Sequence, residues 1–221
     1  MSIEFVRNWP NDVASARAVQ ESLATRVIRK DTLGPVHRVA GVDVGFENSG
    51  RTTRAAIAVL SFPELELHTQ VISRSRTCFP YVPGYLSFRE LPAVLKALEK
   101  LKTTPDLLLC DGQGIAHPRR FGLACHLGVL TDIPSIGVAK SRLIGTHEDL
   151  PPEKGQWVPL VDKGETIGAV LRTRTNVNPV YVSIGHRVSL KTAIDYVLRC
   201  TTRFRLPETT RWAHRLASGP P

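Results

Sequence analysis

The hydrophobic pattern of this chain changes once along its length, and that change limits the possible folds more than any other feature. Residues 39–46, 55–62 and 65–76 are apolar or alternating runs joined by short polar connections. Such runs predict three β-strands in an antiparallel meander. After residue 85 the apolar residues instead recur at helical spacing, with short apolar runs between. A meander followed by alternating helices and strands predicts a mixed sheet.

The helical part of the pattern is clearest just after the change. Its apolar positions follow the i, i+3, i+4, i+7, i+10 spacing of a core-facing helix, and they are Leu91, Val94, Leu95, Leu98 and Leu101. The wholly apolar run 107–110 then predicts a strand covered on both faces. By similar reasoning we predict helices over 12–29, 118–130 and 190–200, one last helical turn over 209–216, and strands over 134–138, 157–161, 165–171 and 180–184.

These elements together predict an α/β fold, with a mixed central sheet and helices on both faces. With 221 residues the chain suits one domain, spanning 1–221 and ending in a basic, polar tail from Thr201. In sheets that contain parallel strands, ligands bind at the carboxyl ends of those strands. The functional residues should therefore be found there.

The charge of the chain favours a polyanionic partner. Twenty-nine Lys and Arg against 20 Asp and Glu give a formal net charge of +9. Nucleic acid is the first candidate for such a protein and an anionic membrane surface the second. The sequence shows no secretion signal and no apolar stretch of the ~18–20 residues that a membrane helix requires. We therefore expect a cytoplasmic protein without a membrane partner, and a monomer is the simplest expectation.

The four cysteines do not indicate a zinc site or a disulfide framework. They are Cys78, Cys110, Cys125 and Cys200, and no two of them form a C-x-x-C pair. Cys110 and Cys125 lie in apolar runs, which is typical of small buried side chains.

Two aspartates occupy positions that are unusual for surface acids. Asp43 lies inside an apolar strand, and Asp111 directly follows the buried run 107–110. A carboxylate in such surroundings is unfavourable unless something balances its charge. Glu90 lies on the core-facing side of the predicted helix. Its alternative role is a capping box, because Ser87-Phe88-Arg89-Glu90 matches S-x-x-E, although Pro92 would then fall beyond the first turn.

Three carboxylates at the centre of a sheet, in a basic protein, suit a hard divalent cation. Mg²⁺ prefers oxygen ligands, and Mn²⁺ is a plausible substitute. One or two such ions could orient water and stabilise the leaving oxygen in phosphodiester hydrolysis. Each acid taken alone could instead be a buried, hydrogen-bonded structural residue. The three together favour the metal site.

The order of these acids resembles that of the ribonuclease H-like nucleases, and the flanking motifs resemble endonuclease V, the deoxyinosine 3′ endonuclease family. Five stretches carry the resemblance: 42–46 (VDVGF), 80–90 (PYVPGYLSFRE), 111–122 (DGQGIAHPRRFG), 136–140 (IGVAK) and 185–189 (GHRVS), with 205–207 and 210–213 extending it. The second and third are long and specific. Two departures are mild: Cys110 and Cys125 replace other small or apolar residues, and Tyr85 replaces a more common apolar one.

The resemblance implies a set of catalytic residues. Asp43, Glu90 and Asp111 would bind the metal, and Lys140 would lie beside the scissile phosphate. His214 would contact a metal-bound water. A lone lysine just after a strand is also plausible as a phosphate contact on chemical grounds, although an ordinary surface lysine is the alternative.

The resemblance also implies how the lesion is recognised. A wedge formed by Pro80, Tyr81, Val82 and Pro83 would enter the duplex, while a pocket would hold the deaminated base out of the stack. The pocket residues would be Gly84, Leu86, Gly112, His117, Gly122 and Leu123. Three arginines flank these segments and are candidate phosphate contacts, namely Arg89, Arg119 and Arg120. From residue types alone, a proline-rich surface turn, a core histidine and solvated arginines are the alternatives.

The implied activity is a Mg²⁺-dependent DNA repair endonuclease. It would bind double- or single-stranded DNA containing deoxyinosine and hydrolyse the second phosphodiester bond 3′ to the lesion, leaving a 3′-hydroxyl and a 5′-phosphate. A second hypothesis keeps the chemistry but directs it at inosine-containing RNA or at branched or mismatched DNA. A third is a binding protein without activity, which predicts the loss of a metal carboxylate. All three carboxylates are present.

Overall fold

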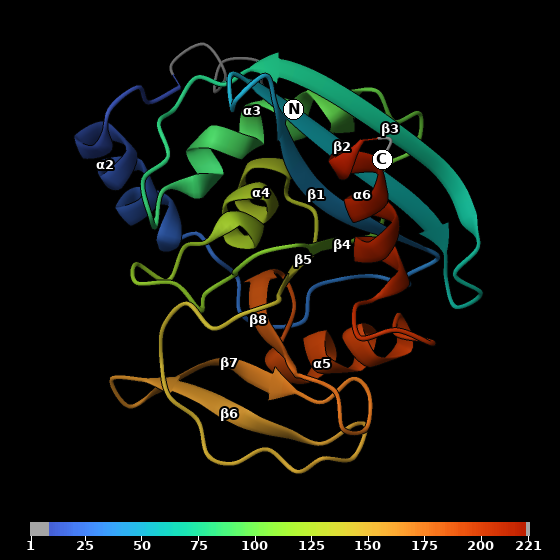
Figure 1. Cartoon of the computed structure of the whole chain (residues 1–221). Coiled ribbons are helices and arrows are strands. Elements are labelled where there is room, and N and C mark those ends of the chain that lie inside the picture. The colour runs from blue at the N-terminus through green and yellow to red at the C-terminus, as the bar shows by residue number, and fades with distance from the viewer. Residues whose placement is uncertain (1–8, 220–221) are drawn as a thin grey trace.

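The sheet is built from strands of small and β-branched residues, and its centre lies where the chain is most apolar. The computed structural model describes residues 9–219. In this part of the chain eight strands form one sheet in the order β3-β2-β1-β4-β5-β8-β7-β6. Their bounds are β1 Arg38–Glu47, β2 Thr52–Ser61, β3 Leu67–Arg76, β4 Leu107–Cys110, β5 Ser135–Ala139, β6 Trp157–Asp162, β7 Glu165–Leu171 and β8 Val180–His186. Figure 1 shows the meander β1–β3 on one side and β6–β8 on the other.

The central strands differ in length, and this difference creates the site. β1 pairs with β2 along its whole length, from Arg38 opposite Ser61 to Glu47 opposite Thr52. β4 is fully buried and pairs in parallel with β1, but only as far as Val42 opposite Cys110. β5 is parallel to β4, and the remaining neighbours are antiparallel. Beyond Cys110 the sheet opens, and the chain leaves β4 between β1 and β5.

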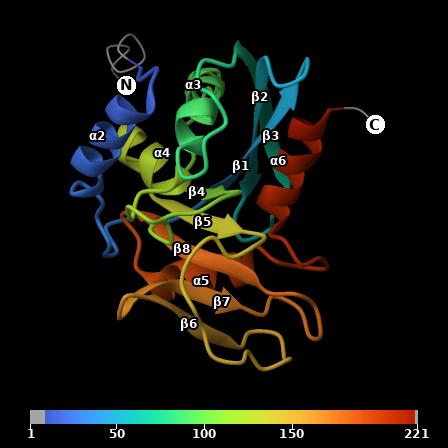
Figure 2. The same ribbon diagram turned by 60° about the vertical axis from the view of Figure 1, so that its left-hand side comes forward.

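Helices cover both faces of this sheet (Figures 1 and 2). Their bounds are α2 Val13–Ala24, α3 Leu86–Glu99, α4 Leu123–Thr131, α5 Leu190–Arg199 and α6 Glu208–Ser218. Ala40 and Val42 point into a core shared with α3 and α4. Gly41 and Gly45 point to the other face, where a Cβ would collide with the backbone carbonyls of Thr209 and Ala217 in α6. The alternation of side chains along β1 thus places α3 and α6 on opposite faces.

Two helices differ from the sequence prediction. α4 begins at Leu123 rather than at 118, because 112–122 is a non-helical segment closed by a hydrogen bond from Gly122 N to Gly114 O (2.9 Å). Glycine disfavours a helix interior, and here it permits close backbone packing. The predicted last turn is instead an eleven-residue helix, α6, whose Ala213 and Ala217 are buried. Small side chains on one face let α6 lie flat against β1.

The remaining predicted elements are confirmed within a few residues. The N-terminal helix ends at Ala24 instead of 29. Nowhere between residues 9 and 219 is there a helix with the length and apolarity needed to cross a membrane.

Candidate active site

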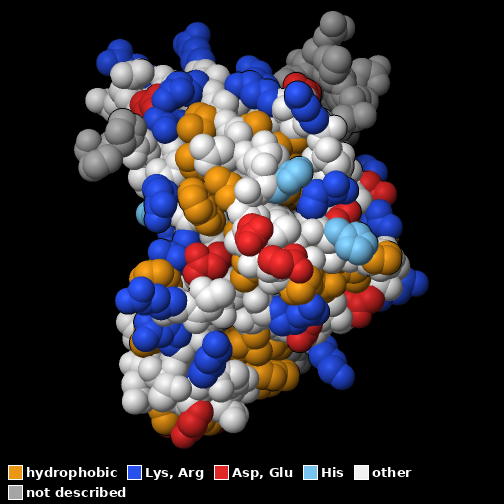
Figure 3. Space-filling model, turned by 90° about the vertical axis from the view of Figure 1, so that its right-hand side faces the viewer, with side chains coloured by type: hydrophobic (Ala, Val, Ile, Leu, Met, Phe, Trp, Pro, Cys, Tyr) orange, Lys and Arg blue, Asp and Glu red, His pale blue; other side chains and the backbone are white. Residues whose placement is uncertain are grey.

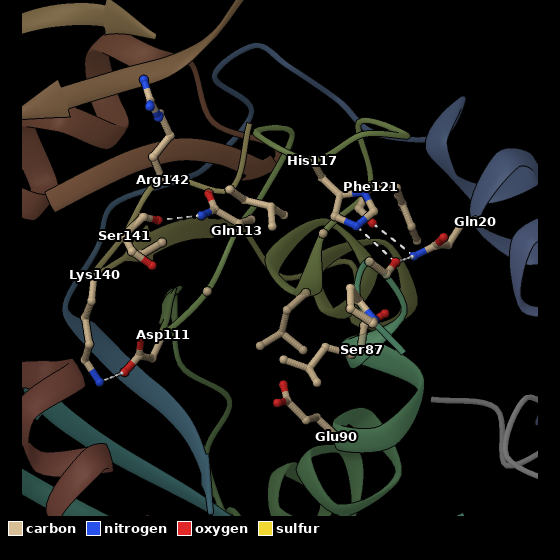
Figure 4. Close-up of a pocket in the computed structure, with 18 of the residues that line it drawn as sticks. Gln20, Ser87, Glu90, Asp111, Gln113, His117, Phe121, Lys140, Ser141 and Arg142 are labelled. Carbon is tan, nitrogen blue, oxygen red and sulfur yellow. Dashed lines mark hydrogen bonds and ion pairs between the residues drawn. The ribbon is translucent and has the colours of Figure 1, made fainter. Parts of the chain in front are cut away.

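Three charged side chains meet where the central strands end. Asp43 belongs to β1, Asp111 follows β4 and Lys140 follows β5. The hydrogen bond from Asp111 N to Val42 O (2.9 Å) holds the start of the β4 exit against β1. Lys140 Nζ lies 2.5 Å from Asp111 Oδ2 (Figure 4). Parallel strands bring their carboxyl ends to one edge, so residues far apart in sequence become neighbours there.

The helix α6 brings a fourth group, His214, to this point. His214 Nδ1 lies 2.7 Å from Asp43 Oδ2. Ligand atoms of Asp43, Asp111 and His214 all lie within 4.8 Å of one another. Two carboxylates and an imidazole nitrogen could hold a divalent cation. Figure 3 shows acidic side chains gathered near the middle of the face that includes α6, with Lys and Arg around them.

The electrostatics of Asp43 fit this use. Burial, and then the negative charge of Asp111, raise the pKa of Asp43 above its ordinary value. The hydrogen bonds from His214 and from Val44 N, and the charge of Lys140, act in the opposite direction without cancelling the rise. The groups around Asp43 therefore do not fully offset the cost of its buried negative charge. A bound cation would do so.

Glu90 lies in α3 on the other side of the opening (Figure 4). It is buried, and it is not part of the three-residue group formed by Asp43, Asp111 and His214. Burial first, and then the charges of Asp43 and Asp111, raise the pKa of Glu90 to about 8. The three predicted carboxylates are thus close enough to influence one another, although Asp43 and Asp111 are the closer pair.

The capping-box alternative for Glu90 is wrong. α3 begins at Leu86 with Tyr85 at its N-cap, so Ser87 is already inside the helix. Ser87 Oγ instead forms a hydrogen bond with His126 Nδ1 (3.0 Å). Pro92 lies inside the helix, as its distance from the predicted cap implied. Glu90 therefore has no capping role that would explain its burial.

A cavity of about 380 Å³ adjoins the carboxylates. All six predicted pocket residues line it, namely Gly84, Leu86, Gly112, His117, Gly122 and Leu123. Glu90, Asp111 and Lys140 line it as well. The structure thus places the predicted base pocket and the predicted metal site in one continuous opening (Figure 4).

This arrangement of acids, lysine and glycine-lined cavity agrees with the comparisons to known proteins. The family model of endonuclease V matches residues 21–215. The chain belongs to the endonuclease V family.

Relatives in this family match over nearly the full chain. An endonuclease V of Rippkaea orientalis is 62% identical over 218 residues, covering 99% of this chain and 95% of the relative. The crystal structure of endonuclease V from Streptomyces avermitilis is 45% identical with a TM-score of 0.92, covering 96% of this chain and 94% of that one. Ciona intestinalis endonuclease V, in complex with a 24mer DNA containing an inosine followed by a ribo-adenosine, is 31% identical with a TM-score of 0.81, covering 93% and 95%. The predicted family and ribonuclease H-like mixed sheet are confirmed.

The wedge predicted from the endonuclease V motif is an exposed loop at the mouth of the cavity. Tyr81 is 71% exposed, and with Pro83 it lines the opening. Pro80 is also exposed, whereas Val82 packs against buried aromatic residues behind the loop. An aromatic ring exposed at the mouth of a cavity is available for contact with a ligand.

The three arginines offered as phosphate contacts have protein partners in the structure. The acceptors are Phe79 and Gly50 carbonyls for Arg89, the Gln20 side chain and Gly84 carbonyl for Arg119, and Asp162 and Glu165 for Arg120. Arg89 also lies over the ring of Phe46. Each guanidinium therefore fixes loops around the site, and its contact with phosphate stays a prediction.

Sequence reasoning missed several residues of the cavity wall. Ser87, Gln113 and Phe121 line the cavity and lie within the motifs at 80–90 and 111–122. Their place in these motifs was a signal that could have identified them. Ser141, Arg142 and Leu143 follow Lys140 directly. No such signal exists for Gln20, because it belongs to α2 and is distant in sequence from every motif.

Proposed function

We propose that this endonuclease V is a Mg²⁺-dependent DNA repair nuclease. It recognises deoxyinosine and hydrolyses the second phosphodiester bond 3′ to it, leaving a 3′-hydroxyl and a 5′-phosphate. The observation that carries the proposal is that Asp111 groups with Asp43 and His214 and also lines the glycine-lined cavity together with Lys140. The inosine-containing DNA bound by the Ciona relative supports the choice of substrate.

Asp43, Asp111 and Glu90 would hold the cation, with His214 beside them. The donors fit Mg²⁺, because carboxylate oxygens predominate and Asp43 and Glu90 both have raised pKa values that a cation would relieve. When bound, one or two such ions supply Lewis-acid stabilisation of the charge that develops on the phosphodiester. Mn²⁺ can take the same ligands.

The chain's own residues position the substrate. Lys140 lies at the boundary between the carboxylates and the cavity, where an ammonium can bind the scissile phosphate. On substrate binding the phosphate would compete with Asp111 for this ammonium. His214 orients the Asp43 carboxylate through its hydrogen bond and so fixes one ligand oxygen.

The wedge and cavity account for recognition of the lesion. Tyr81 would fill the gap in the duplex while the extruded base enters the cavity. Extrusion takes a few kcal/mol and is easiest at a poorly paired base, which favours a deaminated one. Main-chain groups at Gly84, Gly112 and Gly122 can approach the base closely because no Cβ intervenes.

Other features of the protein are proposed with this function. The C-terminal helix packs on the sheet and completes the site, which supports one catalytic domain over the whole chain. We also infer a monomer in the cytoplasm, to be checked by light scattering and by cell fractionation. The second substrate hypothesis, inosine-containing RNA or branched or mismatched DNA, is not favoured by any contact in the structure.

The test is a cleavage assay on end-labelled duplex DNA containing one deoxyinosine. Wild-type protein with Mg²⁺ should give one nick at the second bond 3′ to the lesion, and EDTA or Asp43→Ala should abolish it. Asp195→Ala, on the exposed side of α5, is the matched control and should cut normally. Cleavage of inosine-containing RNA but not of this DNA would overturn the substrate assignment.

A further inference from the structure

The backbone carbonyl of Gly84 lies between the wedge and the cavity and is held by three side chains. It lies 3.0 Å from Gln20 Nε2, 2.7 Å from Arg119 Nη2 and 3.0 Å from His117 Nε2. A carbonyl oxygen has two lone pairs, so three donors saturate it. Gly84 has φ +81°, a left-handed conformation that glycine adopts readily and that other residues disfavour. We call Gln20, His117 and Arg119 the Gly84 clamp; Gln20 and His117 are labelled in Figure 4.

Gln20 is the member of the clamp that no site motif explains. It lies on the buried face of α2 with Ala16 and Leu23 and is only 1% exposed. Its Oε1 accepts a hydrogen bond from Arg119 Nε (2.5 Å), and its Nε2 donates to Gly84 O. Arginine can only donate, so this pairing fixes which way the amide points. The hydrogen bonds at both ends of this buried amide offset the cost of its burial, and their directionality orders the groups that it contacts.

Arg119 extends the clamp to the other side of the wedge loop. Its guanidinium carbon lies 4.1 Å from the ring centroid of Tyr85, the residue that follows Gly84. The same guanidinium donates to Gly84 O and to Gln20. Arg119 therefore contacts the junction of the wedge and α3 twice, by stacking on Tyr85 and by a hydrogen bond to Gly84.

His117 completes the clamp with both ring nitrogens. Its Nδ1 lies 3.3 Å from Arg119 N, which can only donate, so Nε2 carries the proton that is directed at Gly84 O. Burial, and then the charge of Arg119, lower the pKa of His117 to about 4, which keeps this ring neutral. His117 thus lines the cavity without a free nitrogen for the base.

We propose that Gln20 is a positioning residue for lesion recognition, acting through Arg119 to fix Gly84 and hence the Tyr81 wedge relative to the cavity. This inference rests on the proposed function, because it concerns the reading of deoxyinosine. It assigns a recognition role to α2, whose residues are distant from the carboxylates. Loss of the clamp should weaken capture of the lesion while the metal site keeps its chemistry.

Gln20→Met tests the proposal because it keeps the length and packing of the side chain but removes its hydrogen bonds with Gly84, Phe121 and Arg119. We expect KM for inosine-containing duplex to rise about tenfold, as for one lost charge-assisted bond, with kcat unchanged. Glu21→Met, on the exposed side of the same helix, is the matched control and should behave as wild type. Thermal melting of each variant reports whether the fold is intact.

A second measurement does not depend on cleavage. With EDTA present, 2-aminopurine placed beside the inosine should brighten when wild-type protein extrudes the base. The signal should be weaker with Gln20→Met, and wild-type protein should give no signal with inosine-free DNA. No lesion-dependent signal or cleavage with wild-type protein would refute the proposed function. A normal signal and normal KM with Gln20→Met would refute the clamp alone.

Arg119→Lys serves if Gln20→Met does not fold. Lysine keeps the charge but cannot reach Gln20 and Gly84 with a planar fork. The clamp predicts the same rise in KM for this variant, and a double variant no worse than either single one. Unchanged KM in Arg119→Lys, or fully additive effects in the double variant, would overturn the proposal.

Discussion

The carboxylate end and the cavity end of the opening differ in how their polar groups are balanced. At the carboxylate end, burial and mutual repulsion raise the pKa values of Asp43 and Glu90. At the cavity end, the Gly84 carbonyl has a full set of donors, and His117 uses both ring nitrogens. One end needs a ligand to balance its charge, whereas the other is complete before the ligand arrives. Catalytic charge and recognition geometry are thus separated within one cavity.

Neutralising Asp43 should reduce the cleavage rate more than any other change. A small reduction would contradict the view that the carboxylate end carries the catalytic charge. Asp43→Asn should lower single-turnover cleavage about 1,000-fold, because a ligand of the cation is lost. The metal-free variant should melt no lower than wild type, since a repelled, buried charge is removed. Mg²⁺ should then raise the melting temperature of wild-type protein but not that of the variant.

Removing the wedge side chain tests the cavity end and should give the second largest reduction in cleavage rate. Tyr81→Ala should slow cleavage of inosine-containing duplex about 50-fold, as expected from the loss of one aromatic stacking contact. Thermal stability should not change, because Tyr81 is 71% exposed. Cleavage of a single-stranded inosine substrate should fall much less. Equal losses on both substrates would contradict a role in opening the duplex.

The pH dependence of stability sharpens the contrast at the carboxylate end. The folded, metal-free protein keeps the proton of Glu90 up to a pKa of about 8, whereas the unfolded chain releases it near 4.5. Unfolding therefore releases a proton in this window, and the free energy of unfolding falls as pH rises. Between pH 6.5 and 8 the fall should reach about 2 kcal/mol.

Urea unfolding in EDTA across that window measures this fall. Glu90→Gln should flatten the slope, and so should saturating Mg²⁺, which favours the ionised carboxylate. The histidines with lowered pKa values give an opposing slope near pH 6.5, so the difference between wild type and Glu90→Gln isolates the contribution of Glu90. A slope retained in Glu90→Gln would assign the proton to another group.

The buried histidines His117 and His126 should make stability respond to pH in the opposite direction. Burial lowers the pKa of His126 from 6.5 to about 3. Below pH 6.5 the unfolded chain binds a proton that the folded protein excludes, so stability falls as pH falls, by about 1.4 kcal/mol per pH unit. His126→Phe should reduce this slope without removing it, because His117 contributes in the same direction. Urea unfolding between pH 4.5 and 6.5 measures it, and an unaltered slope would contradict the assignment.

The parts of the molecule that could be predicted are those decided by local pattern. The strand 107–110 matches β4 residue for residue, because four apolar residues between breakers have one favourable place, at the centre of a sheet. The spacing around Glu90 correctly placed it on the buried face of its helix. Asp43 and Asp111 could be identified as site residues because a carboxylate in an apolar run is unfavourable unless its charge is balanced.

The parts that could not be predicted depend on contacts between distant segments. α6 is polar by composition, and its tight packing follows from Gly41 and Gly45 on a strand far away in sequence. Arg89 donates to two backbone carbonyls and Arg119 to one, and backbone carbonyls carry no sequence signal. Gln20 meets Gly84 across 64 positions of chain. The local sequence pattern predicted the carboxylates and the strands. The Gly84 clamp could be identified only from the contacts in the folded structure.

The packing of α6 on Gly41 and Gly45 has a consequence for the order of events during protein synthesis. The ribosome adds α6 after all eight strands, and His214 reaches Asp43 only once that helix has docked. A nascent chain that already carries both aspartates therefore lacks a finished site. We therefore expect nuclease activity to appear only after α6 has docked on the sheet.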